Sequence, residues 1–154
     1  MRINFYDAML TDGGRTTLVK EKAVNYDVEK MNTPESVVMI MRELLHMEQM
    51  AEEHCYMVAL NSSCRIMGIF FLSKGTVNAS LITPREVYTR ALLVGAVQIV
   101  LCHNHPSGNV TPSNQDVLIT KQLKEAGELV HVNFADHIIV GGDCYCSFKQ
   151  EGIL

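Results

Sequence analysis

The sequence predicts one α/β domain of the α+β type, in which helices cover a mixed β-sheet. Two runs of apolar residues at helical spacing each begin with Thr-Pro, and an apolar segment between them is interrupted by a polar turn. Strands and helices do not alternate regularly, which argues against a doubly wound parallel sheet. With 154 residues, of which 47% are hydrophobic, the chain is long enough to form a compact core.

The overall composition gives no sign of a nucleic-acid-binding surface, because 13 Lys and Arg against 17 Asp and Glu leave a formal net charge of −4. The first residues lack the basic-then-apolar order of a signal peptide. No apolar run approaches the ~20 residues of a membrane span. We therefore expect a cytoplasmic protein without a membrane partner. The five cysteines form an odd and scattered set, so we expect reduced thiols rather than disulfides.

Residues 1–30 carry the weakest pattern. Segments 16–19 and 23–28 have some β-propensity, and Asp12-Gly-Gly14 marks a turn. We predict a loosely defined N-terminal β-arm or hairpin over residues 1–30, followed by the main domain over residues 31–154.

Two helices are predicted at the Thr-Pro pairs. The first begins at Thr33-Pro34-Glu35, with threonine as N-cap and proline at the first helical position, and extends to about residue 48. The second begins at Thr83-Pro84-Arg85-Glu86, where Glu86 is placed to complete a capping box, and ends near Gly95. We expect both helices to pack on the sheet.

An antiparallel hairpin is predicted between these helices. Residues 55–60 form a continuous apolar strand, Asn61-Ser-Ser63 has turn chemistry, and residues 65–72 return as the second strand. Residues 75–79 are expected to continue as a short edge segment.

The second half of the chain is predicted to alternate between strands and one helix. The expected elements are a strand at 97–102, a helix at 116–127 that ends at Gly127, and strands at 129–134, 137–140 and 144–148. Cys144 and Cys146 could hold a metal, but two thiols on one face of the last strand is the favoured interpretation.

A candidate metal site follows the strand at 97–102. His103 and His105 stand one residue apart, and a Pro/Gly-rich loop separates them from Ser113-x-x-Asp116, which has the pattern of a helix start. Alternate residues of an extended chain point to the same side, so the two rings converge if strand geometry continues. If the loop brings Asp116 back, two imidazoles, a carboxylate and an open fourth position describe a catalytic zinc site. Each motif alone also has a plain structural explanation, as a strand end or a helix cap.

Together, the two motifs and their spacing resemble the JAMM signature of JAB/MPN metallopeptidase-like domains, and the RadC-like JAB proteins in particular. The matching segments are Leu60-Asn-Ser, Gly75-Thr, Thr83-Pro-Arg-Glu86, His103-Asn-His-Pro-Ser-Gly108, Pro112-Ser113-x-x-Asp116, Asp136-His137-Ile-Ile-Val-Gly141 and Tyr145-x-Ser147. The resemblance runs from about residue 33 to the C-terminus. It implies a cytidine-deaminase-like architecture, with a largely antiparallel twisted sheet flanked by helices. Longer RadC-like proteins carry an N-terminal segment resembling a helix-hairpin-helix DNA-binding module, for which residues 1–30 leave no room.

The resemblance also implies roles for individual residues. His103, His105 and Asp116 would bind zinc, although their chemistry does not exclude iron or manganese. Glu53 would be the general base that takes a proton from the zinc-bound water and passes it to the leaving amine. Ser113 would donate a hydrogen bond to the oxyanion or orient the water. From the residues alone, Glu53 is equally well explained as an exposed acid.

The predicted function is a zinc-dependent hydrolase of the JAMM type, which would cleave an amide, peptide or isopeptide bond in a protein or peptide substrate. One alternative is a zinc-stabilised, non-hydrolytic binding module for DNA repair or recombination, with nucleic acid as a partner by family analogy. Another is a scaffold without metal. Asp136-His137 is either a structural pair or a support for the zinc ligands, with Asp136 as the candidate acceptor of an imidazole N–H.

Overall fold

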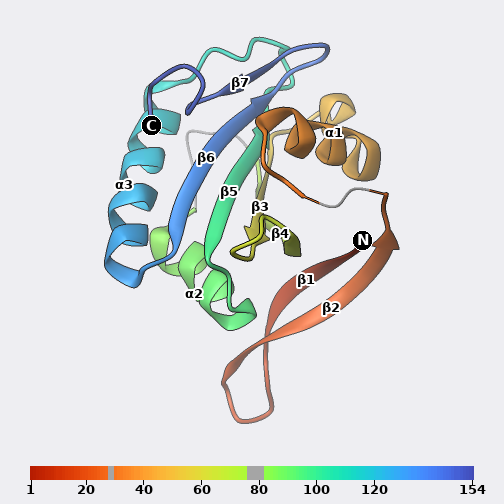
Figure 1. Ribbon diagram of the computed structural model, residues 1–154, viewed down its shortest axis with the longest axis vertical. Helices are drawn as coiled ribbons and strands as arrows, with labels where there is room; N and C mark the ends of the chain where they lie inside the picture. Colours follow the sequence, from red (N-terminus) through yellow and green to blue (C-terminus); the bar gives the residue numbers. More distant parts are fainter. Residues whose placement is uncertain (28–29, 76–81) are drawn as a thin grey trace.

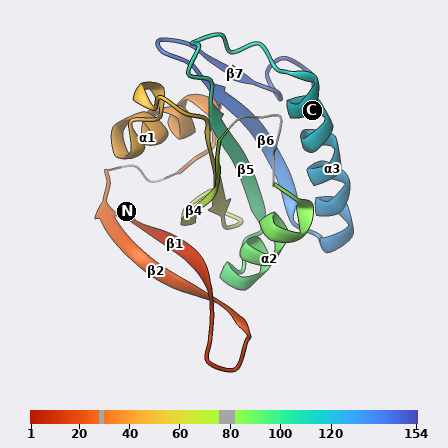
Figure 2. The ribbon, with the colours of Figure 1, turned by 180° about the vertical axis from the view of Figure 1, so that it is seen from behind.

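The computed structural model describes residues 1–27, 30–75 and 82–154, which form a mixed sheet with helices on both faces (Figures 1 and 2). Its elements are β1 (Arg2–Leu10), β2 (Thr16–Asn25), α1 (Pro34–Leu45), the short 3-10 helix η1 (Met47–Gln49), β3 (His54–Leu60), β4 (Ile66–Lys74), α2 (Pro84–Val94), β5 (Gln98–Asn104), α3 (Asn114–Val130), β6 (Asn133–Val140) and β7 (Tyr145–Ser147).

The described strands form one seven-stranded sheet in the order β2-β1-β4-β3-β5-β6-β7. Neighbouring strands are antiparallel except for β1 with β4 and β5 with β6, which are parallel. The predicted α+β class with a mixed, largely antiparallel sheet is therefore confirmed. None of the helices in the described ranges combines the length and apolar character needed to cross a membrane.

Two hydrophobic layers lie on opposite faces of the sheet. α1 covers one face, where Met41 belongs to the same buried cluster as Ile138 of β6. α2 and α3 cover the other face, where Val87 and Leu123 cluster with Leu101 of β5. Each large side chain buried in this way contributes roughly 1.5–3 kcal/mol of transfer free energy. The central strands are buried on both faces, which explains their nearly continuous apolar sequences.

The N-terminal hairpin of β1 and β2 joins the sheet through a short contact. β1 pairs with β2 along its whole length but with β4 only through Phe5 and Tyr6. Ile3 and Phe5 are buried in the α1 layer, whereas the distal end, with Met9 and Leu10 exposed, extends away from the body (Figure 1). Both strands are longer than the β-prone segments that the sequence indicated. The domain boundary after residue 30 stays a prediction.

α1 and α2 begin with the predicted caps. The hydroxyls of Thr33 and Thr83 each accept the amide of the third helical residue, and Glu86 completes the capping box of α2. Gly95 ends α2 in the left-handed conformation, with φ of 73°. α1 ends before the predicted residue 48, because His46 is left-handed at φ 52° and the next turn is η1.

The prediction that α3 ends at Gly127 is wrong. The helix continues to Val130, and His131 ends it in the left-handed conformation with φ of 56°. Gly127 serves close packing instead, because a Cβ there would lie 2.4 Å from the Tyr88 hydroxyl and 2.5 Å from the Val132 carbonyl oxygen. A glycine within a helix can therefore mark a crowded contact rather than an end.

The C-terminal strands also differ from prediction, because α3 is longer than expected and takes up the start of the predicted strand at 129–134. Leu129 and Val130 belong to α3, and β6 is one strand where two were expected at 129–134 and 137–140. Cys144 precedes β7 and is exposed, whereas Cys146 is buried; the cysteines of the structure are free thiols, as expected. Residues 76–79 of the predicted edge segment lie outside the described residues.

Candidate metal centre

β5 places two histidines at the same end of the sheet. His103 lies in the strand and is 6% exposed. His105 lies just beyond it, where its backbone N–H donates to the Val140 carbonyl at 3.0 Å and continues the contact between β5 and β6. The Nε2 atoms of His103 and His105 are 3.0 Å apart. The two rings converge, as the alternation of an extended chain predicted.

Asp116 reaches the histidines from the first turn of α3. The N-cap Ser113 accepts the Asp116 N–H at 3.2 Å, and both its hydroxyl and its backbone N–H donate to Asp116 Oδ2 at 2.7 Å. This reciprocal box holds Oδ1 3.3 Å from His103 Nε2 and Oδ2 3.7 Å from His105 Nε2. Ser113-x-x-Asp116 is therefore both a helix start and the source of the third side chain.

These side chains can hold a metal ion. The candidate ligand atoms of His103, His105 and Asp116 all lie within 4.8 Å of one another. The Nδ1 atom of His105 faces the Asn109 carbonyl at 2.7 Å, and because a carbonyl only accepts, Nδ1 carries a proton. When the ring is neutral, Nε2 is therefore the nitrogen whose lone pair is free for a metal. Two imidazoles and a carboxylate that face one another in this way match the donor set of a divalent metal.

The electrostatics of the site suit a cation. Burial lowers the pKa of His103 to about 4, despite the nearby Asp116 carboxylate. The nearby Asp116 carboxylate raises the pKa of His105, and the charge of Glu53 adds to this effect. Burial alone would raise the pKa of the Asp116 carboxyl, but His105, His103 and Ser113 outweigh it and hold that pKa well below its usual range. An ionised carboxylate beside a neutral imidazole is what metal binding requires.

Glu53 lies on a cleft beside this centre. The cleft encloses about 550 Å³, and the described residues that line it are Glu53, His105, Ser107, Asn109, Thr111, Ser113, Asn114 and Gln115. The structure thus brings both residues predicted to be catalytic, Glu53 and Ser113, to one cavity with a candidate ligand. Their roles in a reaction stay predictions.

Asn104 ties the Glu53 segment to β5, a role that sequence reasoning missed. Its side chain is 1% exposed and stands between the two histidines in sequence. It accepts the backbone N–H of His54 at 2.8 Å and donates to the Glu52 carbonyl at 3.1 Å. The same residue therefore fixes the backbone on both sides of Glu53.

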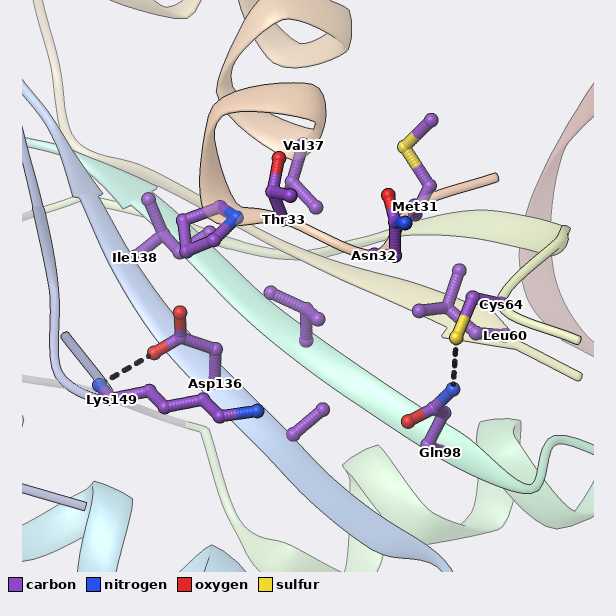
Figure 3. A pocket seen from close by; sticks show the side chains of 13 residues that line it. Met31, Asn32, Thr33, Val37, Leu60, Cys64, Gln98, Asp136, Ile138 and Lys149 are labelled. Carbon is purple, nitrogen blue, oxygen red and sulfur yellow. Dashed lines mark hydrogen bonds between the residues drawn. The ribbon is translucent and has the colours of Figure 1, made fainter. Parts of the chain in front are cut away.

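Asp136-His137 divides between the two faces of the sheet, because successive strand residues point to opposite sides. Asp136 turns to the α1 face, where it accepts from the Ser147 hydroxyl at 2.5 Å and from the Lys149 backbone N–H at 3.0 Å. Figure 3 shows Asp136 and Lys149 in a pocket on that face. Of the two alternatives for this pair, the one in which Asp136 accepts from a ligand imidazole is therefore wrong.

His137 contacts the candidate ligand instead. Its Nε2 lies 2.8 Å from His103 Nδ1, and its Nδ1 lies 2.5 Å from the Thr120 hydroxyl. The ring is 1% exposed and stacks on Phe148, with centroids 4.6 Å apart. Burial holds the pKa of His137 well below its usual range. Neither His137 nor Thr120 could be assigned from the sequence, since the register of β6 decides which residue of the pair faces His103.

Comparison with known proteins agrees with this geometry. Residues 31–153 match the family model described as RadC-like JAB domain. A UPF0758 protein of Clostridium acetobutylicum is 38% identical over 130 residues, which cover 84% of this chain and 56% of that protein. A UPF0758 protein of Clostridium kluyveri is 40% identical over 120 residues, covering 78% of this chain and 51% of the relative.

A further UPF0758 protein, from Caldanaerobacter subterraneus, is 37% identical over 139 residues, or 90% of this chain and 58% of that protein. The chain thus spans a little more than half the length of the curated relatives it matches. The family model covers most of the chain, including the histidines, Asp116 and Glu53. The chain belongs to the family of RadC-like JAB domains, as the resemblance in its motifs predicted.

Proposed function

We propose that this chain is a zinc-dependent hydrolase of the JAMM type that cleaves an amide, peptide or isopeptide bond. One observation carries the proposal: three side chains that can hold a metal converge beside a cleft that also holds Glu53. Two imidazoles and a carboxylate would leave the fourth position of a tetrahedral zinc open, as in catalytic rather than structural zinc sites.

Glu53 is the proposed general base. When bound, zinc supplies Lewis acidity and lowers the pKa of a water molecule toward ~7. Glu53 takes the proton of the attacking water and delivers it to the leaving amine. Its position supports this role, because it lines the cleft with His105 and its charge contributes to the raised pKa of that histidine. Asn104 holds the backbone around Glu53 and thereby keeps the base in place.

Ser113 is the proposed hydrogen-bond donor to the oxyanion. Its hydroxyl donates to Asp116 Oδ2, so it must rotate toward the cleft to serve a substrate. Asp116 would keep the hydrogen bond from the Ser113 backbone N–H during this rotation. The same residue therefore first positions a ligand and then contacts the substrate.

The lining of the cleft favours an amide substrate over a phosphodiester. Apart from Glu53 and His105, the described residues that line it are neutral and polar, and none is lysine or arginine. Phosphate groups are normally bound by such cations. Hydroxyl and carboxamide groups suit the N–H and C=O groups of a peptide chain. We therefore propose a protein or peptide substrate and place nucleic acid second.

The test compares two adjacent carboxylates. Glu53→Gln should retain about one zinc per chain, measured by elemental analysis, and lose turnover by at least about 10²-fold. Glu52→Gln is the matched control, because Glu52 pairs with Lys74 at 2.5 Å and does not line the cleft. Turnover is followed with libraries of internally quenched peptides and of peptides joined through a lysine isopeptide bond.

Each result has a separate meaning. Wild-type turnover in the Glu53→Gln variant would remove Glu53 from the mechanism. A zinc-loaded wild-type protein that cleaves no member of either library, and binds DNA in a salt-dependent manner, would favour the non-hydrolytic alternative.

A further inference from the structure

We propose that Thr120 and His137 act as positioning residues, which place the proton of His103 on Nδ1 and so present its Nε2 lone pair to the metal. The inference rests on the metal-binding part of the proposed function and is independent of hydrolysis. It follows from the order of donors and acceptors along one buried chain of hydrogen bonds.

The series of hydrogen bonds begins at the backbone carbonyl oxygen of Asp116, an atom that can only accept. The Thr120 hydroxyl oxygen lies 2.6 Å from it, so the hydroxyl proton must lie between the two oxygens. Thr120 then has only lone pairs left for its second neighbour, His137 Nδ1, at 2.5 Å. His137 must therefore donate from Nδ1.

The same order of donors and acceptors continues through His137 to the candidate ligand His103. His137 is 1% exposed and packs against Phe148, an environment that favours the neutral imidazole with a single N–H. With that proton on Nδ1, Nε2 is an acceptor, and His103 Nδ1 at 2.8 Å must donate to it. His103 is left with a lone pair on Nε2, which faces His105 and Asp116.

Both candidate imidazole ligands are thus oriented by a backbone carbonyl. His105 is oriented directly by Asn109, and His103 is oriented through two side chains that end on Asp116. The first turn of α3 consequently contributes twice: its carboxylate is a candidate ligand, and its carbonyl sets the tautomer of the opposite ligand. A partner of this kind for a metal-bound histidine typically changes metal affinity by about 10–100-fold.

The first measurement needs no substitution and no metal. Long-range ¹H–¹⁵N correlation spectra of the metal-free, ¹⁵N-labelled protein distinguish imidazoles protonated on Nδ1 from those protonated on Nε2. We expect His103 and His137 to carry the proton on Nδ1. A His103 ring protonated on Nε2 would overturn the proposal.

The second measurement removes the Thr120 hydroxyl, which is the first donor in this series of hydrogen bonds. Thr120→Val keeps the shape of the side chain but removes the hydroxyl, so His137 and His103 should each show a mixture of tautomers. Zinc affinity, measured by competition with a chromophoric chelator, should fall by about 10-fold. Thr120→Ser restores the hydroxyl and should restore both the tautomers and the affinity. Wild-type tautomers and wild-type affinity in Thr120→Val would contradict the proposal.

These readouts separate this proposal from the proposed function. Tautomers are observed without zinc or substrate, so an inactive protein with His103 protonated on Nδ1 would refute hydrolysis and support the positioning role. An active hydrolase whose His103 carries its proton on Nε2 would support hydrolysis and refute the positioning role.

Discussion

The N-termini of α2 and α3 share the same local chemistry but differ in what surrounds them. In each, the N-cap hydroxyl accepts the amide of the third helical residue, whose carboxylate accepts the N-cap amide in return. In α2 these residues, Thr83 and Glu86, are exposed. In α3 the acid is Asp116, which is 4% exposed and lies 3.3 Å from a histidine nitrogen.

The difference shows that a capping box becomes part of a candidate metal site through its position in the fold. α3 begins directly after the loop that leaves β5, so its first turn faces the end of the strand, where His103 and, one residue beyond the strand, His105 lie. A helix N-terminus also stabilises an ionised carboxylate, because the free backbone N–H groups and the helix dipole favour negative charge there. The capping box thus keeps Asp116 both ionised and fixed in place.

The largest expected difference between the two helix starts concerns metal binding. Asp116→Asn preserves an acceptor for the N-cap amide but removes the charge of a candidate ligand. We expect zinc affinity to fall by more than about 100-fold, which exceeds the usual effect of residues outside the ligand set. Glu86→Gln, the matched change in α2, should leave affinity unchanged. Equal zinc content in both variants would show that the two boxes do not differ in function.

A smaller effect is expected from the caps. Ser113→Ala and Thr83→Ala each remove an N-cap hydroxyl, so each should lower the free energy of unfolding by about 0.5–2 kcal/mol, measured by urea denaturation. Only Ser113→Ala should also weaken zinc binding, by about 10-fold, because it releases one hydrogen bond to Asp116. Loss of zinc affinity in Thr83→Ala would mean that helix stability, rather than ligand positioning, controls the site.

The smallest effect concerns pH in the metal-free protein. The pKa of Asp116 is depressed in the folded state, so its stabilising contribution is present above its ordinary pKa of about 4 and is lost at lower pH. The pKa of His105 is raised, so its contribution is complete below about 6.5 and is lost as the pH rises through the folded-state value.

The melting temperature of the metal-free wild type should therefore exceed that of Asp116→Asn by the most, a few degrees, between about pH 4 and 6.5. Thermal melts of both proteins across this range check the prediction. If the difference in melting temperature instead grows steadily toward alkaline pH, the assignment of Asp116 and His105 as a charge pair is contradicted.

Local chemistry made much of the fold predictable. Thr33 and Thr83 are caps whose partners lie within a few residues, and Gly95 ends α2 because little else occupies a left-handed position so easily. Gly127 led to a wrong helix end, because a glycine is needed there for close contact with Tyr88, which is far away in the sequence. Long-range contacts of this kind leave no periodic pattern in the sequence.

The candidate site likewise contains residues that local sequence patterns predict and residues whose roles depend on long-range contacts. His103 and His105 could be found because two histidines one residue apart share a face of a strand, and the spacing to Asp116 matched a family signature. Asn104, Thr120 and His137 could not be found in this way. The contacts of Asn104 and His137 depend on the register between β5, β3 and β6, which includes a bulge opposite Ile99 and Val100. The contact of Thr120 with His137 depends on the placement of α3 beside β6.

The position of the three candidate ligands within residues 103–116 has a thermodynamic consequence. A metal that joins them closes only a short loop, and the entropic penalty for closing a short flexible loop is small. The unfolded chain therefore retains some capacity to chelate the ion through the same side chains. Because binding to the unfolded state subtracts from the stabilisation that a ligand provides, the rise in melting temperature with added zinc will understate the affinity of the folded protein.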